Sequence, residues 1–438
     1  MSETFDRIPR GTHDILPEDE KYWSFVDDIL KKHCLAMGLN QITTPVIDFK
    51  SLFIRSVGTQ SDIVKKEIYS VQRLDTKTED TKDKEERDEL VLRPEVTAQV
   101  ARAYIQHGMQ TWPQPVRLFY LRQPNFRYER PQAGRYRQHF QFGVESFGSD
   151  DPLTDAQLIL LLWQVFQDIK LSDNIIFDIN TIGCKKCRPD VKKQIVKYYK
   201  AHEEQLCDDC RERLKKNPLR VLDCKNPKCQ EITLEAPQII DSICPECQTH
   251  FRQILEILDE LEIPYNLNPQ LVRGLDYYTR TVFEAREETD EKRQSSLVGG
   301  GRYDDLVEEL GGTPTPAVGF SFGYERIIEK LKEKEIEVPE LLGPEVLLVQ
   351  LGDKAKIKSL PLVAKLNRLG FRTTVIPGKE SLRSQLRMAD RLGCEIALII
   401  GQREAFDNTI IFRKMKEGVQ ETIDIERIEK FLIKYFKR

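Results

Sequence analysis

The segment from Val116 to Gly148 constrains the fold of this chain more strongly than any other. It begins with VRLFYLRQPNFRY, which is rich in β-branched and aromatic residues, and it ends with FQFGVESFG, which alternates in polarity. The loop PQAGRYRQ separates the two stretches. This pattern predicts two long antiparallel strands joined by a loop, and the rest of the chain must pack around that pair.

The charged side chains of this hairpin favour a binding face. The strands and the loop carry five charged residues and one polar amide: Arg127, Glu129, Arg135, Arg137, Glu145 and Gln141. Arginines and acids on one face suit a ligand of mixed charge, such as a nucleotide phosphate together with an amino acid. The alternative interpretation is a surface hairpin with a solvated ladder of charges.

The length and composition bound the class of protein. A chain of 438 residues, 40% hydrophobic and 32% charged, predicts two or three ordinary globular domains. It contains no apolar run of about 18 residues for a membrane span, and MSETFDRIPR lacks the apolar core of a signal peptide. We therefore expect a cytoplasmic protein. Because the net charge is only −4, any nucleic acid would be bound by local basic patches.

Eight of the ten cysteines lie in four close pairs within 64 residues of sequence, from 184 to 247. The pairs are Cys184 and Cys187, Cys207 and Cys210, Cys224 and Cys229, and Cys244 and Cys247. Three pairs have the CxxC spacing, which lets two thiolates bind one tetrahedral ion, and cytosolic thiols are kept reduced. We expect structural zinc, with the pairing of the four motifs open. One zinc with unused thiols is the alternative.

The last hundred residues predict a separate basic domain. A charged linker over 332–344 precedes residues 345–438, which carry 19 Lys or Arg and 12 Asp or Glu. Alternating apolar runs and helices over 355–369 and 380–392 predict a small α/β domain with a mostly parallel sheet. Arg383, Arg387 and Arg391 fall on one side of the second helix, where they could contact RNA phosphates. A solvated basic face is the alternative.

Four further strings carry candidate site residues. In LVLRPEVTAQ, Glu95 and Thr97 stand at a helix start, where a helix cap is the alternative role. LVRGLDYYTR contains Arg273, GGGRYDDL begins with three glycines that allow close backbone approach, and GFSFGYERI contains Arg326. Together with FRYERPQAGRYRQ, these strings resemble the motifs of the histidyl-tRNA synthetases, which are class IIa aminoacyl-tRNA synthetases. The resemblance covers nearly the whole chain.

The resemblance implies an α+β class II fold. Its catalytic domain, an antiparallel sheet flanked by helices, would comprise residues 1–171 and 263–331. Residues 172–262 would form a helical, cysteine-rich insertion domain of the bacterial type, and residues 345–438 an α/β anticodon-binding domain. A helix from Pro17 followed by a strand around Pro45 is similar to the element through which these enzymes form homodimers. The implied activity is histidine–tRNA ligation, with ATP and Mg²⁺ and with tRNA(His) as partner.

The resemblance also implies roles for individual residues. Arg127 and Arg273 would be catalytic and neutralise the α-phosphate. ATP would be bound by Arg127, Glu129, Arg135 and Arg326. Histidine would be bound by Glu95, Thr97, Gln141, Glu145, Tyr277 and Tyr278. The tRNA would be bound by Arg10 and Gln132, in addition to Arg383 and Arg387.

One position departs from the family pattern. Family members usually have Phe directly after RYRQ, where it stacks on adenine, whereas here His139 precedes Phe140. The stacking role is therefore open between these two residues. A second function class is the catalytically inactive paralogue that regulates ATP phosphoribosyltransferase. That paralogue lacks the C-terminal domain and loses the motif arginines, both of which this chain retains.

Overall fold

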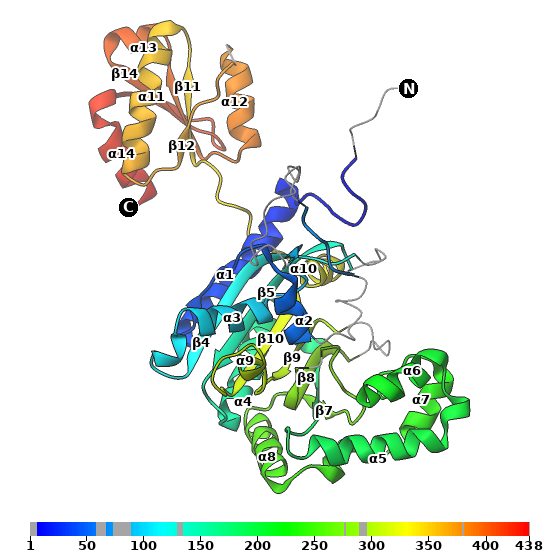
Figure 1. The fold of residues 1–438 in the computed structure, drawn as a ribbon. Coiled ribbons are helices and arrows are strands. Elements are labelled where there is room, and N and C mark those ends of the chain that lie inside the picture. Colours follow the sequence, from blue (N-terminus) through cyan, green and yellow to red (C-terminus); the bar gives the residue numbers. More distant parts are fainter. Residues whose placement is uncertain are drawn as a thin grey trace, which may run out of the picture. The chain divides into compact units, whose positions relative to one another are not determined.

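The computed structural model describes residues 7–57, 67–72, 89–128, 135–275, 277–288, 296–378 and 381–437. The chain divides into two compact units, one up to Pro339 and one from Glu340 (Figure 1). The division lies inside the segment predicted as a linker, although the last helix of the first unit continues to Glu333. Within the described ranges, no helix combines the length and the apolar character needed to cross a membrane.

The first unit is built on an eight-stranded sheet in the order β1-β4-β5-β10-β9-β8-β6-β7. Its strands are β1 (Asn40–Gln41), β4 (Val116–Phe126), β5 (Gln138–Phe147), β6 (Ile175–Thr181), β7 (Tyr265–Leu267), β8 (Thr279–Glu287), β9 (Val298–Arg302) and β10 (Ala317–Gly323). All pairs from β4 to β6 are antiparallel, and only the edge pairs β1–β4 and β6–β7 are parallel. The antiparallel sheet and the predicted hairpin β4–β5 are confirmed.

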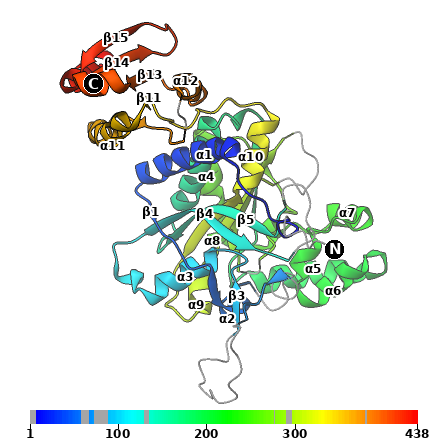
Figure 2. The ribbon, with the colours of Figure 1, turned by 90° about the horizontal axis from the view of Figure 1, so that it is seen from above.

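Helices cover both faces of this sheet (Figure 2). On one face α1 (Pro17–Ala36) packs against α4 (Pro152–Asp168) and α10 (Tyr324–Glu333). Helix α1 begins as expected, with a proline in its first turn followed by three acidic residues that interact favourably with the helix dipole. It buries Trp23, Val26 and Leu30 against the sheet residues Phe119 and Phe142. The other face carries α3 (Thr97–Gln106) and α9 (Leu306–Glu309), next to α2 (Lys50–Val57) and the small sheet of β2 (Ile47–Phe49) and β3 (Leu90–Leu92).

The segment between β6 and β7 forms a helical lobe. It contains α5 (Arg188–Ala201), α6 (Asp208–Lys216), α7 (Pro227–Leu234) and α8 (Pro245–Glu260). Val191, Ile195, Tyr199 and Leu214 are buried in its core. The first residues of the predicted insertion, including β6, belong instead to the main sheet, because the run IIFDI is buried on both faces. We call the remainder, residues 183–262, the insertion.

The second unit is a five-stranded sheet in the order β12-β11-β13-β14-β15. Its strands are β11 (Val346–Gln350), β12 (Thr373–Thr374), β13 (Ile396–Ile400), β14 (Thr409–Lys414) and β15 (Gln420–Asp424), and its helices are α11 (Asp353–Arg368), α12 (Leu382–Arg391), α13 (Gln402–Asp407) and α14 (Ile428–Phe436). The prediction of a mostly parallel sheet is confirmed for β12, β11 and β13, which pair in parallel, whereas β14 is antiparallel to both of its neighbours, β13 and β15. The connection over 401–408 is too short for the crossover that a parallel strand needs.

Candidate active site

One cleft gathers most of the predicted site residues. It encloses about 330 Å³ above strands β5, β8, β9 and β10. The predicted residues that line it are Glu95, Thr97, Arg127, Arg135, Gln141, Arg273, Tyr277, Tyr278 and Arg326. They come from four separate segments of the chain, so the sheet topology brings them together.

Glu145 lies beneath this cleft and is 1% exposed. Its carboxylate accepts hydrogen bonds from the hydroxyls of Thr97 (2.7 Å), Tyr120 (3.4 Å) and Tyr303. Gly319 on the neighbouring strand leaves the space, because a Cβ there would come within 2.0 Å of Glu145 Oε2. Burial raises the pKa of Glu145 to about 8, despite the hydrogen bonds from Tyr303 and Thr97 that lower it. Behind the cleft residue Thr97, a single carboxyl group is therefore fixed in orientation by three hydroxyls.

Tyr303 is a site residue that the sequence analysis missed. Its hydroxyl donates to Glu145 Oε2, and its ring packs edge-on against Tyr277 with centroids 5.5 Å apart. The signal was present in GGGRYDDL, where the tyrosine follows the three glycines. Only the glycines were interpreted there, because an isolated tyrosine after a turn has no pattern of its own.

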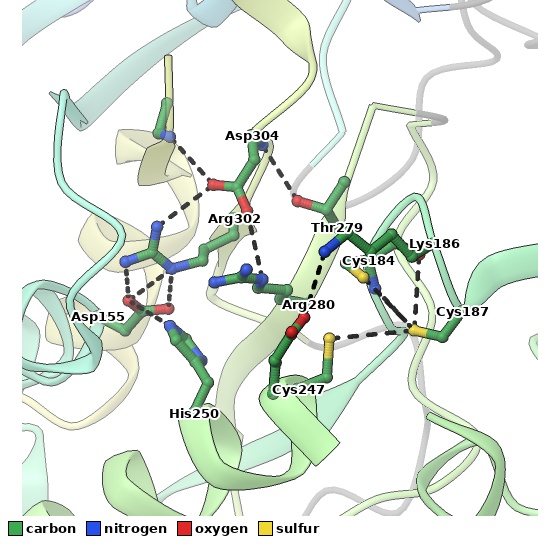
Figure 3. Close-up of polar contacts among 12 residues, drawn as sticks. Asp155, Cys184, Lys186, Cys187, Cys247, His250, Thr279, Arg280, Arg302 and Asp304 are labelled. Carbon is green, nitrogen blue, oxygen red and sulfur yellow. Dashed lines mark hydrogen bonds and ion pairs between the residues drawn. The ribbon is translucent and has the colours of Figure 1, made fainter. Parts of the chain in front are cut away.

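A buried polar network holds Tyr303 in place (Figure 3). Arg302 is fully buried, and its Nε lies 3.0 and 2.8 Å from the two carboxylate oxygens of Asp155. Its Nη1 donates to Asp304 Oδ1 at 3.3 Å. The backbone N–H of Asp304 in turn donates to Thr279 Oγ1 at 3.1 Å. The residues on both sides of Tyr303 are therefore anchored.

Glu95 caps a helix and also lines the cleft. Its Oε1 accepts the N–H of Ala98 at 3.0 Å at the start of α3, which is a helix-capping interaction. Its side chain also lines the cleft, where burial raises its pKa and Arg127 opposes that rise. Arg127 is held beside it, because its Nε donates to the carbonyl of Pro94 at 2.9 Å.

Arg273 also lines the cleft. It forms an ion pair with Glu284 and lies over the ring of Tyr278, 5.7 Å from the centroid. Burial lowers the pKa of Arg273, but the Glu284 carboxylate and Tyr278 outweigh burial, so the pKa lies above its ordinary value. Gly299 is required here, since a Cβ would approach the guanidinium to 2.1 Å. The cleft is thus lined by a charged Arg273 in addition to Arg127.

His139 and Phe140 point to opposite faces of β5. His139 lines the cleft with Gln141, whereas Phe140 packs edge-on against Trp23 of α1, with centroids 5.4 Å apart. Burial, together with Arg127 and Arg326, lowers the pKa of His139 to about 3. A neutral imidazole ring therefore forms part of the cleft wall, and the phenylalanine belongs to the core.

Five of the remaining predicted residues lie away from the cleft or outside the described residues. Arg10 is exposed, and its carbonyl accepts a hydrogen bond from Arg137 at 3.3 Å. Arg383 and Arg387 are exposed on α12, opposite the buried Gln385 and Ala389 of the second unit. Glu129 and Gln132 lie outside the described residues.

The eight cysteines of the insertion form two groups. The base cluster consists of Cys184, Cys187, Cys244 and Cys247, and the distal cluster consists of Cys207, Cys210, Cys224 and Cys229. Within each cluster all sulfurs lie within 4.8 Å of one another. Three sulfur pairs of the base cluster and one of the distal cluster are 3.7 to 3.9 Å apart. A tetrahedral ion with bonds of about 2.3 Å would space its sulfurs by roughly 3.8 Å. Both clusters therefore have the geometry of a tetrathiolate site.

Comparisons with known proteins match the chain over nearly its full length. The family model described as Histidyl-tRNA synthetase matches residues 11–327, and that described as Anticodon binding domain matches residues 345–435. The histidine–tRNA ligase of Dehalococcoides mccartyi is 44% identical over 96% of this chain and 97% of its own length, and that of Desulfitobacterium hafniense is 42% identical over 98% of each. The apo histidyl-tRNA synthetase structure from S. aureus is similar with a TM-score of 0.78 and 32% identity, over 97% of this chain and 99% of its own.

Proposed function

This chain belongs to the histidyl-tRNA synthetase family, and we propose that its cleft activates histidine with ATP and then transfers it to tRNA. Its activity is that of a histidine–tRNA ligase, an aminoacyl-tRNA synthetase. The regulatory paralogue is not favoured, because the anticodon-binding domain is present and the cleft retains Arg127, Arg273 and Arg326. The test is histidine-dependent exchange of diphosphate into ATP.

The position of Glu145 is the observation that carries this proposal. An imidazole ring presents two nitrogens, and each needs one partner in a closed pocket. Glu145 would accept from one nitrogen, while the hydroxyl of Tyr278 would meet the other. An amino acid without these nitrogens would leave Glu145 and Tyr278 without the hydrogen bonds that an imidazole supplies, which is how a polar pocket rejects it.

The other end of the cleft suits the reaction of two anions. The histidine carboxylate attacks the α-phosphate, the bond to the β-phosphate breaks, and diphosphate leaves with the bonding electron pair. Arg127 and Arg273, on either side of the cleft, would neutralise the charge that develops on the phosphate. Glu95, Thr97 and Gln141 would hold the α-amino group, so that the carboxylate faces the phosphorus.

The nucleotide would extend toward Arg326 and Arg135. His139 offers a neutral ring for stacking on adenine, and Glu129 is expected to accept from the adenine amino group. Arg326 would bind the triphosphate, and Arg135 would reach the γ-phosphate or the end of the tRNA. Mg²⁺ bound to the phosphates would supply further positive charge. Glu325, which lines the cleft beside Arg326, offers a carboxylate oxygen of the kind that this ion prefers.

The second unit would bind the anticodon region through α12, with Arg10 and Gln132 of the first unit at the acceptor end. We predict that the double change Arg383→Glu and Arg387→Glu lowers kcat/KM for tRNA by at least about tenfold, because two phosphate contacts become repulsive. Diphosphate exchange should be unchanged, since α12 belongs to the second unit and the residues of the cleft belong to the first. Arg403→Glu, at an arginine that is 88% exposed on α13, is the control. Equal charging by both variants would remove α12 from the tRNA site.

Homodimerisation and a cytoplasmic location complete the proposal. β2 exposes Ile47 and Phe49, each 46% accessible, directly after Pro45. A second copy of the chain would cover these apolar side chains. Sedimentation of the purified protein as a monomer at micromolar concentration would contradict the dimer. The cytoplasm is where tRNA, histidine and ATP meet.

The two cysteine clusters would each hold one structural zinc ion. We predict about two zinc ions per chain in protein purified without added metal, measured by elemental analysis. Cys229→Ser should leave about one, because the distal cluster then lacks a ligand and the base cluster keeps four. Cys394→Ser, at a buried cysteine outside both clusters, is the control and should retain both. A stably folded, metal-free protein would exclude zinc.

A further inference from the structure

Two arginines of the insertion reach the backbone of the loop whose described residues are 271–275, 277 and 278, which carries Arg273 and Tyr278. Arg188 Nη2 donates to the carbonyl of Tyr278. Arg220 Nη1 donates to the carbonyl of Arg273 at 3.1 Å. Gly274 allows this approach, because a Cβ there would meet Arg220 Nη1 at 3.1 Å. The side chains of Arg273 and Tyr278 face the cleft, so both arginines hold the loop by its backbone and leave those side chains available.

Each of these arginines belongs to the framework of one cysteine cluster. Arg188 directly follows Cys187 of the base cluster, and its N–H donates to the carbonyl of Cys184 at 3.0 Å. Gly183, immediately before Cys184, accepts the N–H of Arg280 at 2.9 Å, which ties the same cluster to the start of β8.

Arg220 is tied to the distal cluster in a similar way. It lies in the short helix Pro218–Val221, and the N–H of Cys224 donates to the carbonyl of Val221 at 3.1 Å. Arg213 of α6, which also carries Cys210, donates to the carbonyl of Arg220 at 3.4 Å. A rigid cysteine cluster therefore fixes the backbone position of the arginine that is tied to it.

We propose that Arg188 and Arg220 are positioning residues for histidine activation, holding the loop so that Tyr278 and Arg273 face histidine and the α-phosphate. The proposal rests on the proposed function of the cleft. Both donors are cationic, and charge-assisted hydrogen bonds are stronger than neutral ones. A displacement of about 1 Å at a reacting group costs up to roughly a hundredfold in rate. The insertion thereby contributes to catalysis without touching the substrate.

The two contacts predict different kinetic effects. Arg220→Met should lower kcat of histidine-dependent diphosphate exchange by about tenfold to a hundredfold, with KM for histidine nearly unchanged, because Arg273 acts on the phosphate. Arg188→Met should instead raise KM for histidine by about tenfold, because Tyr278 binds the imidazole. In both variants, amide hydrogen exchange over residues 271–278 should be about tenfold faster, while the zinc content stays that of the wild type.

Arg211→Met is the matched control. Arg211 also directly follows a cluster cysteine, Cys210, and donates to the carbonyls of Glu203 and Glu204 at 3.2 Å, inside the insertion. It should leave kinetics and loop exchange as in the wild type. Arg188→Lys and Arg220→Lys keep a cationic donor and should recover most of the lost activity, which covers the case in which a methionine variant folds poorly.

Three results would overturn the proposal. They are methionine variants that match Arg211→Met in kinetics and loop exchange, lysine variants as impaired as the methionine ones, and loss of zinc in every variant at positions 188 and 220. The last would show that the arginines hold the insertion itself. If the wild type shows no histidine-dependent exchange, the proposed function fails, while the hydrogen-exchange comparison still decides whether the arginines hold the loop.

Discussion

Arg273→Ala is expected to slow histidine-dependent adenylate formation by about a hundredfold to a thousandfold without unfolding the protein. Loss of one preorganised charge at the reacting group has an effect of this size. The variant leaves Glu284 without its cationic partner, but that side chain is 23% exposed and can be hydrated. Single-turnover formation of histidyl-adenylate measures the rate directly.

Arg286→Ala is the matched control for this variant. Arg286 lies on β8 and forms an ion pair with Asp178 at 2.9 Å, with a side-chain exposure of 22% against 20% for Arg273. It does not line the cleft. Loss of a half-buried ion pair should therefore affect stability in both variants, whereas adenylate formation should fall only in Arg273→Ala. Equal rates in the two variants would remove Arg273 from the catalytic residues.

Glu145→Gln is expected to raise KM for histidine by roughly tenfold to a hundredfold. The change preserves the shape of the side chain but removes a carboxyl group that can ionise when histidine binds, and a hydrogen bond to a charged group contributes about 1.5–3 kcal/mol. KM for ATP should change little, because Glu145 contacts none of the described residues proposed to bind ATP. The measurement is diphosphate exchange at varied histidine, with Glu308→Gln, at an exposed site on α9, as control.

The same variant predicts a change in pH dependence. The pKa of Glu145 is about 8 in the folded protein against 4.5 for an ordinary glutamate side chain, so the folded state holds its proton more tightly than the unfolded state. This proton stabilises the ligand-free protein fully below pH 4.5, and the stabilisation is lost as pH rises toward 8. Between pH 5 and 7, the free energy of unfolding of the wild type should fall by roughly 2 kcal/mol relative to Glu145→Gln. Urea unfolding that gives the same difference in free energy of unfolding between the two proteins at pH 5 and pH 7 would contradict the assignment.

Local pattern was sufficient to predict the elements that organise the fold. The aromatic and β-branched run from Val116 to Phe126 forms β4, and the alternation after Gln138 forms β5. Period-two alternation also places His139 on the same face as Gln141 and Glu145, with Phe140 opposite. That parity was readable from the sequence, and it is what puts the histidine in the cleft wall.

Contacts that depend on long-range register could not be predicted. Gly319 makes room for Glu145 only because β10 pairs with β5 so that these two residues are directly opposite. Tyr303 reaches the same carboxylate because β9 lies on the other side of β10. Likewise, CxxC spacing predicts metal ligands but not that the first pair joins the fourth, since this depends on how the insertion helices return to the sheet. The antiparallel pairing of β13, β14 and β15 depends on the length of the connections between them. A local pattern of apolar residues does not contain this information.

The central claim is that this cleft selects and activates histidine, and diphosphate exchange into ATP with each of the twenty amino acids tests it most directly. The account predicts exchange with histidine alone, which Arg273→Ala suppresses and Arg286→Ala retains. Exchange with a different amino acid would show that Glu145 and Tyr278 do not form an imidazole pocket. A folded protein that exchanges with no amino acid would contradict the claim itself.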